Sequence, residues 1–495
     1  MVVVQSFSGR VQVQFMNAVP PNSASLIAAL TGVLSDGGLL TEAEDLVRYS
    51  RDWSGDHFGR PLAVARPSSV EEMSALMRHC HAERIPVVPQ GGLTGLVGAA
   101  VAADGNEVVV SLERMDRIRS ISPIDFAMVV EAGCILEDAK RAAEESDCIL
   151  PITFGAQGSC RIGGNVATNA GGFNVLRYGM TRDLVLGLEV VLADGRIWNG
   201  LKVLRKDNRG YDLKQVFIGS EGTLGIVTAA ALKLFPRPTQ IETALVGLRS
   251  VEDAMALYAR ARRGCSDLLT AFELILRGGI EITMREGKDF HEPLGKPYPA
   301  YVLIEVSSGG LIDLKDMLLS FLAGVEDLVE DGIVASTRAQ GERLWLYREI
   351  MVERQGRGGR YLRTDVSVPI SKLADFVTDA LFELGRARPD ALPVTYGHVG
   401  DGNIHLNVVP PEGMAAEAIE HLFEEAEAEI FAVVDRYGGS ISAEHGIGRV
   451  KQRAFLDRID PVALDLAAGI KDAIDPRHIL SNGRILASAS ALDYR

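Results

Sequence analysis

Two short segments near the C-terminus hold three of the nine histidines in this chain of 495 residues. The first, YGHVGDGNIHLN, runs from Tyr396 to Asn407, and the second, AEHGIG, runs from Ala443 to Gly448. Histidine nitrogens and carboxylate oxygens are donors that bind zinc and related divalent cations. Residues of these types, gathered so closely, predict a metal site.

The first segment has the pattern of a β-hairpin. Asp401-Gly402 is a typical two-residue hairpin turn, and with that turn His398 faces His405 across the two strands. Directly opposed side chains have Cβ atoms about 4.5–5.5 Å apart, so two imidazoles there could share one cation. Glu444 completes a His₂Glu set with an open coordination position, which is typical of catalytic rather than structural sites.

The predicted metal ligands are therefore His398, His405 and Glu444, with zinc as first choice and manganese or iron as alternatives. The neighbouring His445 points elsewhere on a glycine-bent loop and is the candidate general base. The alternative interpretation is a pair of histidines at a sheet edge without a metal.

Glycines are concentrated in three loops, at residues 89–96, 155–172 and 218–227. Consecutive glycines let backbone N–H groups converge on one anion, and small polar residues without apolar periodicity indicate close approach to a ligand. For the first loop, a plain tight turn is the alternative interpretation. The sequence contains neither GxGxxG nor GxxxxGK[ST], so a Rossmann site and a P-loop are disfavoured. The three loops together predict a long ligand with a diphosphate in its middle.

The elements that must position these motifs alternate between strands and helices. We predict strands at residues 62–65, 85–89 and 108–112, and a helix through Ala82 that Ser69 caps. Short strands separated by a helix indicate an α and β fold with parallel strands.

The remaining elements are read from apolar runs and turn residues. The expected elements are a helical lead-in over 22–50, a buried strand over 184–193, a boundary at Pro236 and Pro238, helices over 311–328 and 371–384, a loop over 355–360, an acidic helix over 412–437 with a solvated face, and a new turn after Asp475-Pro476.

Composition limits the class of protein. The length exceeds what one hydrophobic core usually spans, so two or three domains are expected. A net charge of −15 disfavours nucleic-acid and anionic-membrane partners, and an anionic substrate would need local arginine, lysine or metal. Five cysteines without CxxC indicate buried thiols in a reducing cytosol. No apolar run reaches the roughly 18 residues of a membrane span, and no signal peptide is recognisable. We therefore expect a cytoplasmic protein, with either Met1 or Met16 as its start.

From Asp52-Trp53 to about Leu486, the sequence resembles the FAD-linked D-2-hydroxy-acid dehydrogenases of the vanillyl-alcohol-oxidase flavoprotein superfamily. The branch is the one that contains the D-2-hydroxyglutarate and D-lactate dehydrogenases. The matching strings are PQGGLTGLVG, GSCRIGGNVATNAGG, RYGMTRDLVLGLEVVLADG, LRKDNRGYDLKQVFIGSEGTLGIVT, YGHVGDGNIHLNV and AEHGIG.

The resemblance implies an α+β fold with a two-part FAD-binding domain. That domain would span residues 22–237, a cap domain for substrate and metal would span 238–460, and a C-terminal segment, 461–495, would return to the FAD domain. FAD would be bound non-covalently. The residues that the resemblance and the loops assign to it are Pro89, Gly91, Gly92, Leu93, Thr94, Gly95, Leu96, Gly155, Ser159, Gly163, Gly164, Asn165, Thr168, Asn169, Gly171, Gly172, Glu221, Gly225, Ile226, Val227 and Asn482.

The resemblance also implies residues for the substrate. Arg348 matches the family's carboxylate-binding arginine, and Arg363 matches a lysine that meets the distal carboxylate in the 2-hydroxyglutarate enzymes. Arginine keeps the charge of lysine but changes reach and geometry. Val352 stands where the family has a threonine, and Asn407 would lie at the substrate beside His445. Surface ion pairing is the alternative interpretation of both arginines.

Two departures from the family concern the cofactor. Leu93 replaces a common asparagine in the diphosphate loop, and Ser481-Asn482-Gly483 replaces the usual Asn-Pro-Gly.

The implied reaction is oxidation of a D-2-hydroxy acid, such as D-2-hydroxyglutarate or D-lactate, to the 2-oxo acid. The metal would bind the substrate's hydroxyl and carboxylate as a Lewis acid, His445 would accept the hydroxyl proton, and the C2 hydride would pass to flavin N5. Electrons would go to an electron-transfer flavoprotein, a quinone or a dye, and a homodimer is one assembly that fits. The alternatives are an oxygen-using oxidase, a metallohydrolase with the same His₂Glu set, and a non-catalytic FAD-binding subunit.

Overall fold

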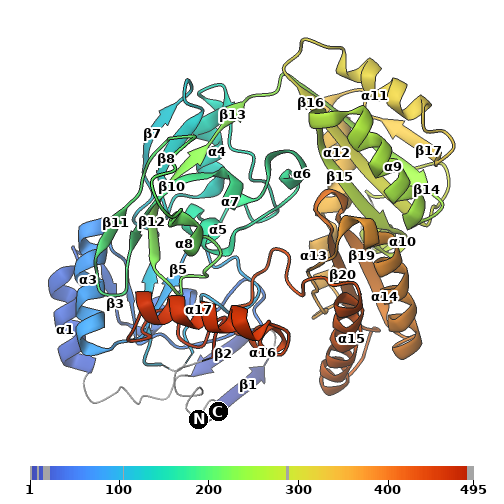
Figure 1. Ribbon diagram of the computed structural model, residues 1–495. Helices are drawn as coiled ribbons and strands as arrows, with labels where there is room; N and C mark the ends of the chain where they lie inside the picture. The colour runs from blue at the N-terminus through green and yellow to red at the C-terminus, as the bar shows by residue number, and fades with distance from the viewer. Residues whose placement is uncertain (1–2, 8–9, 15–22, 104, 286–288, 488–495) are drawn as a thin grey trace.

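The computed structural model describes residues 3–7, 10–14, 23–103, 105–285 and 289–487, with side chains from residue 26 onward. Met16, one of the two candidate starts, lies outside these residues. The chain forms two lobes, each built on its own sheet or sheets, and α17 (Pro461–Ile474) returns to the first lobe (Figure 1). The expected α+β class is confirmed.

The first lobe contains the elements up to β13. In chain order they are β1 (Val3–Phe7), β2 (Arg10–Gln14), α1 (Ser23–Val33), β3 (Leu39–Leu40), α2 (Ala43–Leu46), η1 (Val47–Tyr49), β4 (Ala63–Ala65), α3 (Val70–Glu83), β5 (Val87–Gln90), β6 (Val108–Ser111), β7 (Ile118–Ser122), β8 (Ala127–Glu131), α4 (Leu136–Glu144), β9 (Cys148–Ile149), α5 (Ile162–Thr168), α6 (Val175–Tyr178), α7 (Thr181–Leu184), β10 (Val185–Val191), β11 (Ile197–Asn199), α8 (Lys214–Phe217), β12 (Ile226–Lys233) and β13 (Phe235–Pro236).

Two sheets organise this lobe. The smaller has the order β3-β4-β6-β5, and β4, β6 and β5 are parallel, as predicted. The larger, β11-β10-β12-β8-β7, is antiparallel throughout. The N-terminus of α3 forms as expected, because the Ser69 hydroxyl accepts the Glu72 backbone N–H. The central strands of both sheets are apolar and share one core, so the lobe positions the glycine loops that extend from their ends.

The second lobe is built on one antiparallel sheet with the order β17-β14-β16-β15-β19-β20-β18. Its elements are β14 (Gln240–Leu248), α9 (Val251–Gly264), η2 (Ser266–Leu268), β15 (Leu269–Leu276), α10 (Arg277–Arg285), β16 (Ala300–Ser308), α11 (Leu314–Ala323), β17 (Val329–Val334), α12 (Arg338–Glu349), α13 (Met351–Gly356), β18 (Val366–Ser367), η3 (Ile370–Lys372), α14 (Leu373–Ala387), β19 (Leu392–His398), η4 (Val399–Asp401), β20 (Asn403–Val409), α15 (Ala416–Arg436) and α16 (Gln452–Leu456).

Helices cover both faces of this sheet. One core joins the sheet to α9, α11, α14 and α15, and a second core joins its other face to α10, α12 and α13. Because side chains alternate along a strand, Glu273, His398 and His405 share the face toward α12 and α13 with the second core's Ile275 and Tyr396. This face carries the candidate site.

The structure corrects three of the predicted elements. The helix expected over 311–328 is confined to Leu314–Ala323, and the loop expected over 355–360 begins only after α13 ends at Gly356. The acidic helix α15 has a buried side, formed by Leu422, Phe423, Ala426, Ile430 and Val434, so the solvated face is only half of it. Acidic residues on the other side dominated the sequence pattern.

Two buried cations attach the C-terminal segment to the first lobe. The Lys471 ammonium donates to the carbonyl oxygens of Thr223 and Leu480 and to Asp475. The Arg484 guanidinium donates to Glu107 at 2.6 Å. Buried charges of this kind require partners, so these contacts hold the returning chain against the first lobe.

Candidate active site

The hairpin that carries two of the predicted metal ligands forms, but its turn is longer than predicted. His398 pairs with Asn403, and His405 pairs with Tyr396. The predicted His398–His405 pairing is therefore wrong by two residues. Since side chains alternate along a strand, a shift of two keeps both histidines on one face, and their ring centroids are 5.9 Å apart.

The reason for the longer turn lies in its hydrogen bonds. The Gly402 N–H donates to the Val399 carbonyl oxygen, which closes a turn over 399–402. Gly402 has φ +80, and the Asp401 carboxylate accepts the Asn403 N–H. These contacts make Asp401 and Gly402 the end of a four-residue turn rather than its centre.

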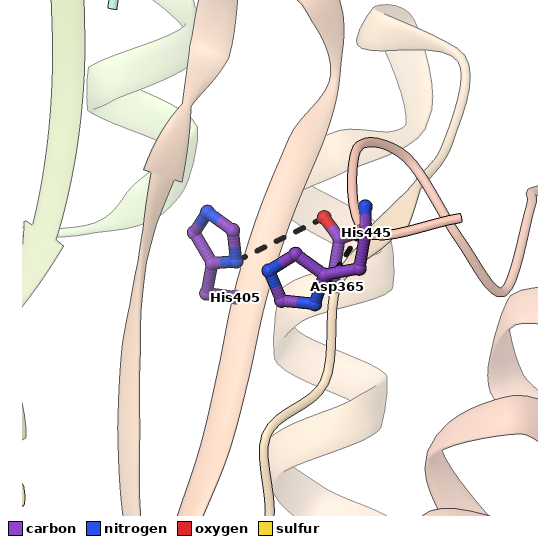
Figure 2. Close-up of side chains that lie close together, drawn as sticks. All are labelled: Asp365, His405 and His445. Atoms are coloured by element: carbon purple, nitrogen blue, oxygen red, sulfur yellow. Dashed lines mark hydrogen bonds and ion pairs between the residues drawn. The ribbon is translucent and has the colours of Figure 1, made fainter. Parts of the chain in front are cut away.

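The structure brings the three predicted metal ligands together. One ligand atom from each of His398, His405 and Glu444 lies within 4.8 Å of the others. A second set, Asp365 with His405 and His445, meets the same criterion. Both sets are largely buried, and they share His405. Figure 2 shows the second set, in which Asp365 lies near His405 and His445.

Hydrogen bonding distinguishes the two sets. Asp365 Oδ2 accepts the backbone N–H groups of Ala443, Glu444 and His445 at 2.8–3.1 Å, and Oδ1 accepts the Asn403 amide at 2.9 Å. A carboxylate with four donors has little capacity left for a metal. Asp365 therefore anchors the loop that carries Glu444 and His445, and His398, His405 and Glu444 are the better ligand set.

One buried carboxylate, Glu273 on β15, holds two predicted site residues. Its Oε1 lies 2.5 Å from His398 Nδ1, and its Oε2 accepts Arg348 Nε–H at 2.9 Å. Burial lowers the pKa of His398, but the Glu273 carboxylate outweighs it and raises the pKa to about 9. With Nδ1 donating to Glu273, Nε2 is the nitrogen left for a metal, which is the usual arrangement of a metal-binding histidine.

Burial governs the other ionisable groups of the site. It raises the pKa of Glu444 to about 7, and it lowers the pKa of His405 well below its ordinary value. Burial also lowers the pKa of His445. His445 is therefore neutral near pH 7, the form that a proton acceptor needs.

The three glycine-rich loops meet in the first lobe. A Cβ at Gly92 would lie 2.2 Å from the Ser159 carbonyl oxygen, so the first loop packs directly on the second. Glu221 N–H donates to the Ala167 carbonyl oxygen, which joins the third loop to α5. The predicted convergence of the loops is thus present in the structure.

The loop backbones fit an FAD diphosphate. A Cβ at Gly95 or Gly164 would meet no described protein atom within 4 Å, so packing within the protein does not require glycine there. Gly91 lies against Gly164 in the first turn of α5, and no side chain caps the start of that helix. The N–H groups of Ile162 and Gly163 at that start donate to the Cys134 and Ala132 carbonyl oxygens. The glycine backbone at residues 91–95 and Gly164 is therefore the part suited to bind phosphate.

Other residues assigned to the cofactor have their side chains engaged within the protein. Ile226 and Val227 lie in the core strand β12, and Gly225 packs against Val190. The Thr168 hydroxyl donates to the Gly164 carbonyl oxygen, and the Asn169 carbonyl accepts the Arg182 N–H. The Asn165 amide donates to Cys160 Sγ, and Ser159 Oγ donates to the Ala156 carbonyl oxygen. At Asn482 the backbone carbonyl oxygen accepts from Arg484. These contacts fix the loops and leave few side-chain groups at these positions for FAD.

Two contacts join the glycine loops to the loop that carries Glu444 and His445. Glu444 Oε1 accepts the Gly172 N–H at 2.6 Å. The Glu221 carboxylate, which we expected at the cofactor, accepts the N–H groups of Ile447 and Gly448 at 2.7 and 2.8 Å. The candidate metal set and the candidate flavin loops are therefore parts of one site.

The predicted substrate residues lie around this set. Arg348 is buried, and its Cζ lies 4.3 Å from the Tyr396 ring centroid and 5.1 Å from that of Phe173. Asn407 donates both amide hydrogens to protein, one to Gln355 and one to the Tyr396 hydroxyl.

A cavity of about 560 Å³ lies beside the site. Residues of both lobes line it, among them Phe173 and Trp345, whose rings are 5.1 Å apart. Phe173 also lies 5.4 Å from the His398 ring. The cavity therefore reaches the side of the metal set where Phe173 stands.

Comparison with known proteins identifies the family. Residues 61–200 match the model of an FAD binding domain, and residues 237–485 match that of the C-terminal domain of FAD linked oxidases. The chain is 40% identical to the mitochondrial D-2-hydroxyglutarate dehydrogenase of Rattus norvegicus over 451 residues, which are 90% of this chain and 82% of that protein. It is 38% identical to the D-2-hydroxyglutarate dehydrogenase of Xanthomonas citri pv. viticola, over 92% of this chain and 95% of that protein.

The chain belongs to the FAD-linked D-2-hydroxy-acid dehydrogenase family. This confirms the resemblance and the predicted class of FAD-dependent oxidoreductase acting on CH–OH groups.

Solved structures of other flavoproteins have the same fold as this chain. The 4-ethylphenol oxidase of Gulosibacter chungangensis matches with a TM-score of 0.74 and 15% identity, over 96% of this chain and 99% of that one. A p-cresol methylhydroxylase matches with a TM-score of 0.73 and 18% identity, over 95% of this chain and 98% of that one. At such identities the likeness concerns the fold, which is that of the vanillyl-alcohol-oxidase flavoproteins.

Two residues of the site, Glu273 and Asp365, were not predicted from the sequence. Glu273 is the one charged residue in the strand LTAFELIL, and a lone carboxylate in an apolar strand must find partners when it is buried. That signal was available. Asp365, in RTDVSVP, carried no comparable signal, because its partners lie 38 to 80 residues away.

Proposed function

We propose that this chain oxidises a D-2-hydroxy acid to the 2-oxo acid with non-covalently bound FAD and a divalent metal. The observation that carries the proposal is the contact of Glu444 with Gly172, because it joins a His₂Glu set to a loop suited to FAD. The names of the rat and Xanthomonas relatives give D-2-hydroxyglutarate as their substrate. Both lines support a hydroxy acid as substrate.

The residues present fit both groups. FAD would be held by the backbones of residues 89–96 and 163–172, and zinc by His398, His405 and Glu444. When bound, FAD supplies the hydride acceptor and the metal supplies Lewis acidity toward the hydroxyl.

The chain's own residues bind and orient the substrate. Glu273 and the rings of Tyr396 and Phe173 hold Arg348 in one place, and its remaining guanidinium N–H groups bind the 1-carboxylate. His445, neutral because it is buried, accepts the hydroxyl proton on a ring nitrogen. Asn407 retains acceptor capacity on Oδ1, which also receives the Thr364 N–H.

A panel of D- and L-2-hydroxy acids, followed by bleaching of the flavin band under anaerobic conditions, tests the proposal. We expect D-acids to bleach the band and L-acids to leave it. His445→Ala should slow flavin reduction while FAD stays bound. Unchanged reduction in that variant would contradict the role of His445, and a panel without any bleaching would contradict the proposed function.

The same assay separates the alternatives. Fast reoxidation in air would favour an oxygen-using oxidase over a dehydrogenase that needs an electron-transfer flavoprotein, a quinone or a dye. A Saccharomyces cerevisiae relative, 35% identical, is named D-2-hydroxyglutarate–pyruvate transhydrogenase, so pyruvate belongs among the acceptors tested. A metallohydrolase would not need the FAD binding domain that the chain matches.

We also propose a domain division at residues 237 and 460, a homodimer, and a cytoplasmic location. The rat relative's name places that protein in mitochondria, whereas the Xanthomonas relative's name gives no compartment. Among the residues that the structure describes, no helix is both long and apolar enough to cross a bilayer.

A further inference from the structure

A segment of the first lobe, residues 53–58, lies against the second lobe at Arg363. Asp56 Oδ1 pairs with Arg360 Nε at 3.1 Å, and Asp56 Oδ2 pairs with Arg363 NH1 at 3.3 Å. Asp56 and Arg363 are 307 residues apart in sequence. The pair therefore connects the two lobes beside the site.

Arg363 stands next to residues already placed in the site. The following residue, Thr364, donates its N–H to Asn407 Oδ1, and Asp365 accepts the N–H of His445. The segment before β18 therefore carries Arg363 to the rim of the region in which the substrate would lie.

Aromatic rings surround the Arg363 guanidinium. Its Cζ lies 4.4 Å from the Tyr361 ring centroid and 5.8 Å from that of Trp53. The Trp53 side chain itself remains 55% exposed. The NH1 group of Arg363 pairs with Asp56, whereas its Nε is buried and has no hydrogen-bond partner among the described residues.

The charges around Arg363 cancel. Asp56 lies between Arg360 and Arg363, and Glu420 pairs with Arg360 on its other side. Two cations thus face two carboxylates. A second carboxylate on the substrate would have to displace Asp56 or approach it, and like charges a few ångströms apart repel.

We propose that Asp56 is a specificity-determining residue, which neutralises Arg363 and makes the site select 2-hydroxy acids with one carboxylate and an uncharged side chain over dicarboxylates. The inference rests on the proposed function and narrows its substrate class. The 1-carboxylate is still bound by Arg348, while the side chain of the substrate meets Trp53 and Tyr361 instead of a free cation. The pair thus makes this chain differ from relatives named for D-2-hydroxyglutarate.

The test compares kcat/KM of the holoenzyme for D-2-hydroxyglutarate, its uncharged 5-amide and D-lactate. The 5-amide matches hydroxyglutarate in length but lacks the second charge. We expect the wild type to prefer the 5-amide and D-lactate over hydroxyglutarate by at least about tenfold, which corresponds to about 1.4 kcal/mol. Asp56→Asn should raise the ratio of hydroxyglutarate to 5-amide by about tenfold, chiefly through KM.

Glu420→Gln is the matched control, because Glu420 pairs with Arg360 and not with Arg363. It should leave the ratio within about twofold of wild type. Asp56→Ser provides a second variant in case the asparagine substitution disturbs folding. A wild type that prefers hydroxyglutarate, or an unchanged ratio in both Asp56 variants, would overturn the inference.

A binding measurement separates this inference from the proposed function. Shifts of the flavin band report the affinities of 2-oxoglutarate and pyruvate without turnover. If no hydroxy acid bleaches the flavin, the proposed function fails. Asp56→Asn must still increase the affinity for 2-oxoglutarate and leave the affinity for pyruvate unchanged. Equal effects on both ligands would overturn the role of Asp56.

Discussion

Replacement of Glu273 by glutamine should disturb the metal site and the carboxylate site at once. The carboxylate accepts from His398 with one oxygen and from Arg348 with the other, and it is fully buried. A glutamine offers one acceptor oxygen and one NH₂ group. If the NH₂ faces His398, then Nδ1 must become the acceptor and the proton moves to Nε2, which removes the lone pair available to the metal. If it faces Arg348, two donors meet and the guanidinium loses its counter-ion.

The size of the effect follows from this geometry. Removing one partner of a buried ion pair costs about 3–5 kcal/mol, and losing the group that orients a metal-binding histidine costs about 10–100-fold in metal affinity. We therefore expect Glu273→Gln to bind zinc at least about tenfold more weakly. We also expect KM for the hydroxy acid to rise, because Arg348 no longer has one fixed position.

Glu305→Gln is the matched control, because Glu305 is a half-buried carboxylate on the neighbouring strand β16. It accepts from neutral donors, Trp345 Nε1 and Thr270 Oγ1, and burial raises its pKa. Its replacement should cost about 1 kcal/mol of stability and leave zinc affinity unchanged. Zinc affinity is measured by competition with a chromophoric chelator, and stability by urea unfolding. Equal zinc affinities in Glu273→Gln and the wild type would refute the reasoning.

The remaining predictions concern other parts of the site. Asp365→Asn leaves a buried N–H donor without a partner and loosens the loop of the metal-binding glutamate, so zinc affinity measured by chelator competition should fall about tenfold or more. Glu221→Gln removes one of two acceptors for backbone N–H groups, so hydrogen exchange in residues 445–449 should quicken while FAD stays bound. Gly92→Ala places a Cβ 2.2 Å from a carbonyl oxygen and should yield protein without FAD by absorbance, even before a ligand is considered. The free energy of unfolding of the chelator-treated protein should fall as pH rises from about 6.5 to about 9. The reason is that His398, whose pKa folding raises from 6.5 to about 9, stabilises the fold only while it is protonated. Melting temperatures measured against pH check this, and Glu273→Gln should abolish the fall.

Local patterns predicted local structure well. The helix after Ser69 and the parallel strands near it formed because capping and apolar runs act over a few residues. The predicted pairing of the hairpin was wrong by two residues. The dipeptide Asp-Gly alone does not distinguish a two-residue turn from the four-residue turn that the Gly402–Val399 hydrogen bond closes. The prediction of the ligand set survived the error, since a shift of two preserves the face of a strand.

Long-range partners could not be predicted in the same way. Glu273 meets His398 across 125 residues, and Asp56 meets Arg363 across 307. Such pairs depend on which strands become neighbours and on how two lobes meet. Alternation and turn signals describe one segment at a time, so they identify a residue that needs a partner without identifying the partner.

Charge in the site gives an argument for the metal that is independent of spacing. An anionic substrate must enter a protein with a net charge of −15, and the carboxylates Asp365, Glu273 and Glu221 would repel it if they were free. Each of them instead faces several donors: backbone N–H groups and an amide at Asp365, His398 and Arg348 at Glu273, and two backbone N–H groups at Glu221.

Glu444 differs from these three carboxylates. Its hydrogen bond in the described structure comes from the Gly172 N–H, and burial raises its pKa to about 7. A carboxylate in this state is either protonated or beside a cation. Protonation would remove the charge that a ligand needs, whereas a divalent cation shared with His398 and His405 would keep Glu444 ionised and give the substrate's carboxylate and hydroxyl a positive centre to approach. The electrostatics of Glu444 therefore support the proposed metal at the place that the two histidines allow.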